Sequence, residues 1–98
     1  MEDKYVVLGR IFASKNRLNV LLSLSEALKT PSGLSTDLGL HLSYVSKILG
    51  ELKDMELVEC KNQKLIKGRI YGLTKFGIET LQEIKHLETG KRGENKIA

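Results

Sequence analysis

One stretch of the chain, residues 33–59, restricts the fold more than any other part of the sequence. Its middle carries apolar residues at the i, i+3, i+4 and i+7 spacing of one buried helical face, namely Val45, Ile48, Leu49 and Leu52. Leu34 and Leu38, at i and i+4, predict a shorter helix ahead of it that packs on the same core. Gly39 can take the left-handed conformation that ends a helix. The stretch is therefore predicted to form two short helices joined by a tight turn and followed by a strand.

The outward face of the second helix is predicted to be polar, because the buried face is already assigned. It carries Ser43, Tyr44, Ser46, Lys47, Gly50 and Glu51. Hydroxyls, a phenol and an ammonium at the start of a helix can hydrogen-bond to base edges and phosphates in the major groove of DNA. Tyr44 could instead pack against its own helix. We interpret four of these residues as candidate DNA contacts: Ser43, Tyr44, Ser46 and Lys47.

Three sequence motifs occur in order along the chain. They are NRLNVLL at residues 16–22, LGL at 38–40 with YVSKIL at 44–49 and LVE at 57–59, and RIYGLTKFG at 69–77. In this order they resemble the winged helix-turn-helix of prokaryotic and archaeal transcriptional regulators of the arsenical-repressor and multiple-antibiotic-resistance types. The resemblance covers residues 14–87. It implies a recognition helix that enters the major groove and a β-hairpin wing beside it.

Two positions depart from the family pattern. Glu56 stands where many members have a glycine that ends the recognition helix, so this end needs another cap. His41 stands where a serine or threonine usually caps the helix, and Ser43 is an alternative cap that would start it two residues later. The cysteine-rich metal motif of metal-sensing members is also missing, since Cys60 is the one cysteine. We therefore expect no metal site and no cofactor.

Helices and a hairpin are predicted on either side of this motif. Residues 3–12 are apolar on several sides and predict a first helix, and residues 16–28, capped by Ser14, predict a second. Within that second helix Leu18, Leu21, Leu22 and either Leu24 or Leu28 are expected to face inward. Pro31 suits the first turn of the next helix, because it needs no backbone donor there.

The chain after the recognition helix is predicted to form the wing and a last helix. Residues 57–61 and 69–73 are the expected strands, and Thr74 is the expected cap of the last helix. The predicted fold class is mainly α with a small β-hairpin, a winged helix-turn-helix with extra N-terminal and C-terminal helices. We expect one domain over residues 1–88. Residues 89–98 are polar, contain glycine and lack periodicity, and are expected to be disordered.

The predicted hairpin concentrates positive charge. Between Cys60 and Ile70 the chain has no acidic residue and carries Lys61, Lys64, Lys67 and Arg69. A basic wing can neutralise phosphates beside the major groove or reach into the minor groove. The alternative is that these lysines only keep a hairpin tip solvated. The coincidence of the basic run with the wing favours DNA contact for all four residues.

The two terminal helices carry more apolar residues than packing on one core requires. In the first helix Tyr5, Leu8 and Phe12 form a stripe that Val7 and Ile11 widen. In the last helix Ile78, Leu81, Ile84 and Leu87 recur every three residues. Pairing these helices across a two-fold axis would bury both sets. We therefore predict a homodimer whose interface contains Tyr5, Leu8, Ile11, Phe12, Leu81, Ile84 and Leu87.

Composition agrees with a small nucleic-acid-binding protein. The 98 residues carry a formal charge of +4, which favours polyanions weakly. No apolar run approaches the roughly 18 residues of a membrane span, and residue 1 does not start a signal peptide, so we expect a cytoplasmic protein without a membrane partner. No spacing of carboxylates, histidines or serines suggests catalysis, so we expect no enzyme.

The sequence thus predicts a sequence-specific, double-stranded-DNA-binding transcriptional regulator that acts as a homodimer. The recognition helix would lie in the major groove and the basic wing on the phosphate backbone. Two alternatives stay open: a winged-helix module that binds a protein partner, and an architectural DNA-binding protein with little sequence preference. Glu51 and Asp54 repel phosphate from the C-terminal half of the recognition helix, which leaves its N-terminal half as the contact surface.

Overall fold

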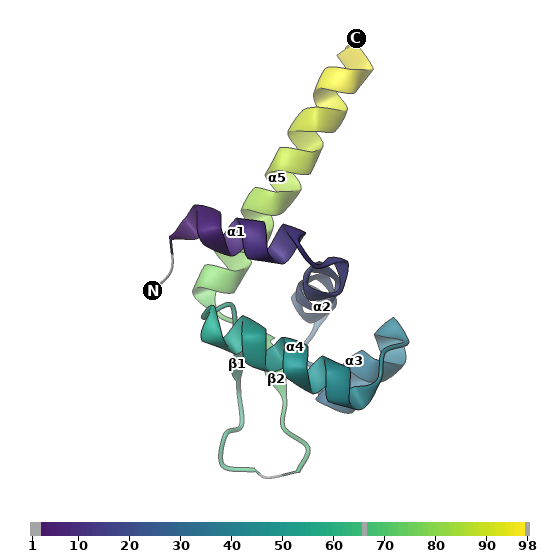
Figure 1. Ribbon diagram of the computed structural model, residues 1–98, viewed down its shortest axis with the longest axis vertical. Helices are drawn as coiled ribbons and strands as arrows, with labels where there is room; N and C mark the ends of the chain where they lie inside the picture. Colours follow the sequence, from purple (N-terminus) through teal and green to yellow (C-terminus); the bar gives the residue numbers. More distant parts are fainter. Residues whose placement is uncertain (1–2, 66, 98) are drawn as a thin grey trace.

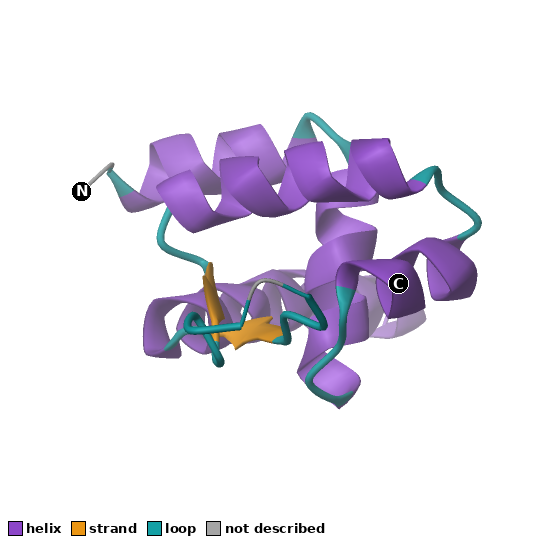
Figure 2. Ribbon diagram, turned by 90° about the horizontal axis from the view of Figure 1, so that it is seen from below, coloured by secondary structure: helices purple, strands orange, loops and turns teal. Residues whose placement is uncertain are grey.

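The computed structural model describes the backbone of residues 3–65 and 67–97, and the side chains of these residues up to Leu87. Within this part, the elements follow in the order α1 (Lys4–Phe12), α2 (Lys15–Glu26), α3 (Pro31–Leu38), α4 (Leu42–Asp54), β1 (Val58–Cys60), β2 (Tyr71–Leu73) and α5 (Lys75–Ile97). The hairpin and the far end of α5 extend from opposite ends of the helical core (Figure 1), along the longest of the molecular dimensions of 52 × 30 × 21 Å. Nearly all the regular structure is helical, and the strands are short (Figure 2). The predicted fold class is confirmed.

Three of the predicted start and stop signals lie at helix ends in the structure. Ser14 caps α2, where its hydroxyl accepts a hydrogen bond from the Arg17 N–H at 3.3 Å. Pro31 occupies the first turn of α3, directly after the N-cap Thr30. Gly39 ends α3 in the left-handed conformation, with φ 67°. Each of these residues acts on backbone groups close to it in the sequence, and packing between the helices does not change that role.

α2 ends at Glu26, before the predicted end at residue 28. The cause is a backbone pairing with the wing: the Lys29 N–H donates to the Tyr71 carbonyl at 3.1 Å, and the Tyr71 N–H donates to the Lys29 carbonyl at 2.8 Å. This pairing draws the chain before Lys29 into an extended conformation. Of the two alternative inward residues, Leu24 is buried and Leu28 is 57% exposed.

The core forms where the helical periodicity of α4 predicts it. The four apolar residues of α4 are buried and pack in one cluster with side chains from the other helices, including Val7, Ile11, Leu21, Leu34 and Ile84. α4 is therefore held on one face only. Its opposite face is left at the surface.

α4 ends in a Schellman motif. The Glu56 N–H donates to the Lys53 carbonyl at 2.9 Å, and the Leu57 N–H donates to the Leu52 carbonyl at 3.0 Å. Glu56 has φ 63°, the left-handed conformation that glycine adopts at least cost. The helix thus ends with the hydrogen bonds of this motif, and a glutamate occupies the left-handed position.

The hairpin pairs Val58 with Leu73 and Cys60 with Tyr71, in strands shorter than the predicted 57–61 and 69–73. The ladder stops because the side chain of Asn62 takes over: its Oδ1 accepts the Ile70 N–H at 2.7 Å. One further backbone bond, from the Lys61 N–H to the Ile70 carbonyl at 2.7 Å, lies beyond the strands.

The junction from β2 into α5 is closely packed. Thr74 caps α5 as predicted, with its hydroxyl oxygen accepting the Gly77 N–H at 2.9 Å and its own N–H donating to the Leu57 carbonyl at 3.0 Å. A Cβ added at Gly77 would lie 2.0 Å from the Leu57 carbonyl oxygen, so only glycine fits. The threonine and glycine of the third motif therefore dock the start of α5 against Leu57, in the short segment between α4 and β1.

α5 continues as a helix to Ile97, into the segment expected to be disordered. No helix end marks the expected boundary at residue 88, and the lysine, arginine and glutamate of this segment are good helix formers. The side chains of residues 88–97 lie outside the described part. Among the described helices, none combines the length and the apolar character needed to cross a membrane.

Candidate nucleic-acid interface

The outward face of α4 carries the four residues predicted as contacts. α4 begins at Leu42 with His41 as its N-cap, and the His41 side chain makes no capping hydrogen bond. The alternative start, two residues later with Ser43 as the cap, is therefore wrong, because the His41 backbone alone begins the helix. Four exposed side chains follow along the first half of α4: Ser43, Tyr44, Ser46 and Lys47.

Tyr44 is 38% exposed and is joined to the start of α2. Its hydroxyl accepts a hydrogen bond from the Asn16 Nδ2 at 3.3 Å. The phenol thus stays at the surface with an oriented hydroxyl. Asn16 was not among the predicted site residues, because 28 positions separate it from Tyr44 and no periodicity connects them.

A second link between α2 and α4 joins Arg17 to Glu51. The Arg17 Nε and NH2 groups donate to the two carboxylate oxygens of Glu51, each at 3.3 Å, and NH1 donates to the Arg10 carbonyl at 2.7 Å. Hydrogen bonding from the Arg17 guanidinium lowers the pKa of the Glu51 carboxyl below its ordinary value. The Glu51 carboxylate, predicted to repel phosphate, is thus paired in the structure, at the side of α4 that faces α2.

The wing loop is organised by Asn62. Its Nδ2 donates to the Gly68 carbonyl at 3.1 Å, and its backbone carbonyl accepts the Leu65 N–H at 3.0 Å. Gly68 has φ 69°, which allows the return turn. Lys64 and Lys67 are exposed near the tip. The two predicted lysines therefore lie on a loop that extends from the helical core (Figure 1).

The remaining two basic residues of the wing lie on different sides of its base. Arg69 donates from Nε to the Leu65 carbonyl at 2.8 Å, and it lines a recess that Ser46 of α4 and Ser32 at the start of α3 also line. Lys61 pairs with Glu59 at 3.2 Å and lines a different pocket, against α5. The fold thus brings Arg69 together with the face of α4 and separates Lys61 from it. Ser32 is a further polar residue at this recess that sequence analysis did not identify.

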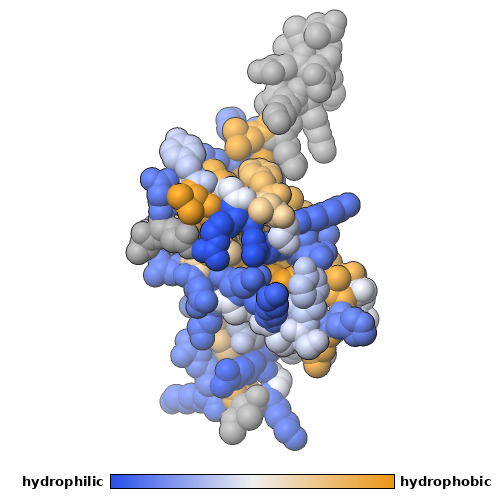
Figure 3. All heavy atoms as spheres, viewed as in Figure 1, coloured by the Kyte–Doolittle hydropathy of each residue, from blue (hydrophilic) through white to orange (hydrophobic). Residues whose placement is uncertain are grey.

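The residues predicted for a dimer interface divide into two groups. Leu8, Ile11, Leu81 and Ile84 are buried within the single chain. The expectation that they form spare surface is wrong, because α1 and α5 use them to cover the core. Tyr5, Phe12 and Leu87 are exposed, by 77%, 54% and 48%. In the view of Figure 3 apolar surface lies around α1 and the adjoining part of α5, with further apolar patches lower on the right, and the hairpin is largely hydrophilic.

Few other side chains in the described part of the protein suggest catalysis or metal binding. No group of three or more histidine, cysteine, aspartate or glutamate side chains there could hold a metal ion. Cys60 is a free thiol buried in β1, and His41 and His86 are exposed. The polar face of α4 and the basic wing remain the candidate site.

Helices α2, α3 and α4 with the antiparallel hairpin define a winged helix-turn-helix domain. Residues 14–59 match the family model described as bacterial regulatory protein, arsR family. The matched segment, just under half of the chain, is similar to the helix-turn-helix of this family, which is one of regulatory proteins and not of enzymes. The resemblance predicted from the sequence is confirmed.

Three solved structures illustrate the similarity of fold. Reduced HlyU from Vibrio cholerae is 29% identical with a TM-score of 0.71, and the match covers 88% of this chain and 86% of that one. A MarR family transcription regulator is 26% identical with a TM-score of 0.72, covering 82% and 54%. Lactococcus lactis ZitR in complex with DNA is 21% identical with a TM-score of 0.61, covering 83% and 60%.

The chain therefore spans about three fifths of ZitR and about half of the MarR family regulator. A comparison with curated protein sequences gave no match. Together these likenesses establish the winged helix-turn-helix fold.

Proposed function

We propose that the protein is a sequence-specific, double-stranded-DNA-binding transcriptional regulator that acts as a homodimer. The main support is one observation: an α4 held by its apolar face presents a polar face beside a basic hairpin. In the ZitR complex a domain of this fold is bound to DNA. A regulator of this kind acts where the DNA is, which in a prokaryotic cell is the cytoplasm.

Base reading is assigned to the first half of α4. Ser46 and Lys47 are exposed one turn from the N-terminus of the helix, where a helix in the major groove comes nearest to base edges. Ser43 and Tyr44 lie at the N-terminal turn, where backbone N–H groups also favour phosphate. The Asn16 hydrogen bond orients the Tyr44 hydroxyl for such a contact.

Phosphate binding is assigned to Lys64, Lys67 and Arg69. The first two are exposed on the wing loop, and Arg69 lines the recess that Ser46 also lines. Charges in these places can neutralise phosphates on either side of the groove that α4 occupies. Lys61 lies at the base of the wing in an ion pair with Glu59. Because its charge is partly neutralised there, we assign it a smaller part in phosphate binding.

The homodimer is supported by apolar side chains that the single chain leaves uncovered on its terminal helices. They include Tyr5, Val6 and Phe12 on α1 and Leu87 on α5. Pairing them across a two-fold axis would remove them from water and hold two α4 helices on one side. Half-sites about 34 Å apart, or a multiple of that distance, would match such a dimer.

Selection from random duplex DNA followed by sequencing tests the proposal. Enrichment of a palindrome would support both specificity and a two-fold dimer. Tight binding without enrichment would favour an architectural role. Absence of DNA binding at low salt would exclude the proposed function and favour a protein-binding module.

A further inference from the structure

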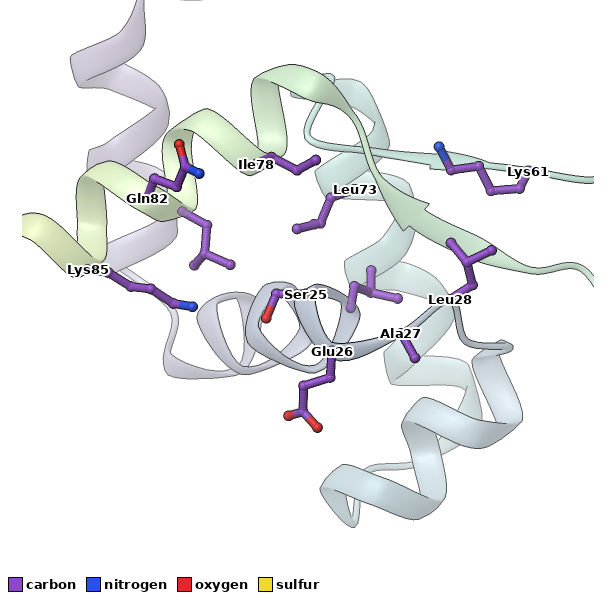
Figure 4. Close-up of a pocket in the computed structure, with 11 residues that line it drawn as sticks. Ser25, Glu26, Ala27, Leu28, Lys61, Leu73, Ile78, Gln82 and Lys85 are labelled. Atoms are coloured by element: carbon purple, nitrogen blue, oxygen red, sulfur yellow. The ribbon is translucent and has the colours of Figure 1, made fainter.

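A pocket of about 510 Å³ lies between the end of α2, the strand β2 and one side of α5 (Figure 4). Its apolar lining includes the buried Leu24 and Leu81 and the half-buried Leu73. Two further apolar residues of the lining, Leu28 and Ile78, are 57% and 47% exposed. A volume of this size is within the range of small-molecule sites. The candidate DNA contacts on α4 and at the wing tip are not part of it.

Three charged side chains line the pocket, two lysines and one glutamate. Lys61 and Lys85 approach it from opposite ends, and Lys85 extends from α5 toward Ser25 of α2 (Figure 4). Glu26 also belongs to the lining, but its carboxylate points away from the pocket (Figure 4). Lys61 is paired with Glu59, whereas Lys85 has no ion-pair or hydrogen-bond partner among the described residues. The pocket thus offers an apolar wall and an ammonium that is free to bind an anion.

We propose that this pocket binds an anionic amphiphile, a small molecule with an apolar body and a carboxylate head. The apolar body lies against Leu28, Leu73 and Ile78 and removes their exposed carbon from water. The head binds the Lys85 ammonium in a charge-assisted hydrogen bond. Lys61, at the other end, adds a second positive charge within reach of a longer or doubly charged ligand.

A second copy of the chain is a poorer occupant. In a two-fold contact the same surface meets itself, so the lysines of both copies would be brought together. Three of the four exposed apolar residues named for the proposed dimer lie on α1, and α1 packs on a different side of α5, where Lys4 pairs with Glu83 at 2.5 Å. A small anion avoids the repulsion and uses the positive charge.

The wall of the pocket continues into the wing. Leu28 directly precedes Lys29, whose backbone pairs with Tyr71 of β2, and Lys61 follows β1. An occupant therefore contacts α5 and both sides of the base of the wing. If the proposed DNA-binding function holds, this ligand is placed to act as an effector. Ligand binding itself is measured without DNA, so failure of either proposal can be recognised separately.

Titration calorimetry of the protein with decanoate, decanol and decylamine tests which head group the pocket prefers. The three ligands have the same unbranched ten-carbon chain and differ only in the head group. Decanoate is expected to bind at one site per chain, at least about tenfold more tightly than decanol, because the neutral alcohol lacks the charge-assisted bond. Decylamine is expected not to bind. Equal affinities for decanoate and decanol would overturn the proposal, and so would the absence of decanoate binding.

Two variants locate the site, each with a matched control. Lys85→Gln is expected to weaken decanoate binding about tenfold, and Lys75→Gln, on the same helix but outside the pocket, is expected to leave it unchanged. Ile78→Ser is expected to weaken binding of both decanoate and decanol, whereas Leu65→Ser, which removes a similarly exposed leucine from the wing, is not. Thermal unfolding checks that each variant is folded. Equal effects of Lys85→Gln and Lys75→Gln would mean that only net charge matters and would overturn the site.

Discussion

Arg17 and Glu51, 34 positions apart in the sequence, form a two-point ion pair that joins α2 to α4. The same guanidinium donates to the Arg10 carbonyl at the end of α1. One side chain therefore ties together α1, α2 and the helix that carries the candidate DNA contacts. The side chains of Arg17 and Glu51 are 20% and 29% exposed, so solvent weakens the pair only in part.

Glu51→Gln is expected to lower the free energy of unfolding by up to about 1 kcal/mol at neutral pH. Arg17 lowers the pKa of Glu51 in the folded state, so the pair stabilises the fold above the ordinary carboxyl pKa. That contribution is lost as the pH falls through the lowered, folded-state pKa. Urea unfolding measured at decreasing pH should therefore bring variant and wild type together. Asp54→Asn, an exposed carboxylate on the same helix, is the control, and an equal loss there would contradict the role of the pair.

Gly77→Ala is expected to lower the free energy of unfolding by about 1–3 kcal/mol, because its Cβ would overlap the Leu57 carbonyl. Helix propensity alone predicts the opposite effect, an increase in the free energy of unfolding of up to about 1 kcal/mol. Gly50→Ala has open space around the new Cβ and should show that gain. Urea unfolding of both variants gives the comparison. A stabilised Gly77→Ala variant would mean that α5 is docked less closely.

Replacing Lys64 and Lys67 together by alanine is expected to weaken binding to all DNA sequences alike. The slope of log affinity against log salt should decrease by about 0.9 for each phosphate that the wing no longer neutralises. Fluorescence anisotropy over a range of salt concentrations measures both. The matched control removes the same charge from α5, with Lys75→Ala and Lys85→Ala. An unchanged slope in the wing variant would show that these lysines do not contact the backbone.

Ser46→Ala or Lys47→Ala is expected to reduce the preference for the selected sequence over random DNA by about 1–3 kcal/mol for each base that the side chain no longer reads. Competition between the two duplexes measures this preference directly. Ser25→Ala serves as control, since its hydroxyl donates to the Leu22 carbonyl on α2. If specific and random DNA lose affinity equally, these side chains position the helix and read no bases.

Phe12→Glu or Tyr5→Glu is expected to convert the proposed dimer into a folded monomer, because both side chains are exposed in the single chain. Sedimentation equilibrium at micromolar concentration gives the mass, and circular dichroism checks the fold. Leu65→Glu on the wing, a similarly exposed apolar residue, should leave the dimer intact. A monomeric wild type in this experiment would exclude the dimer. Leu8→Glu or Ile84→Glu would be uninformative, since these residues are in the core and their substitution unfolds the chain.

The sequence alone determined the elements and their faces, because these depend on neighbours within one or two helical turns. The spacing of Val45 to Leu52 in α4 predicts its buried side and therefore its polar one. Ser14, Pro31, Gly39 and Thr74 act on backbone groups only a few residues away, so their roles could be predicted from the printed sequence.

Only the tertiary structure decided which surfaces are covered and which side chains meet. Leu8, Ile11, Leu81 and Ile84 were predicted to be spare apolar surface, but α1 and α5 lie across the core and bury them. The Arg17–Glu51 pair and the pocket that Leu28 lines both bring together segments that are distant in the chain. The placement of Lys61 and Arg69 on different sides of the wing also depends on packing between such segments. Periodicity describes one helix at a time, whereas these interactions depend on how the helices are placed against each other.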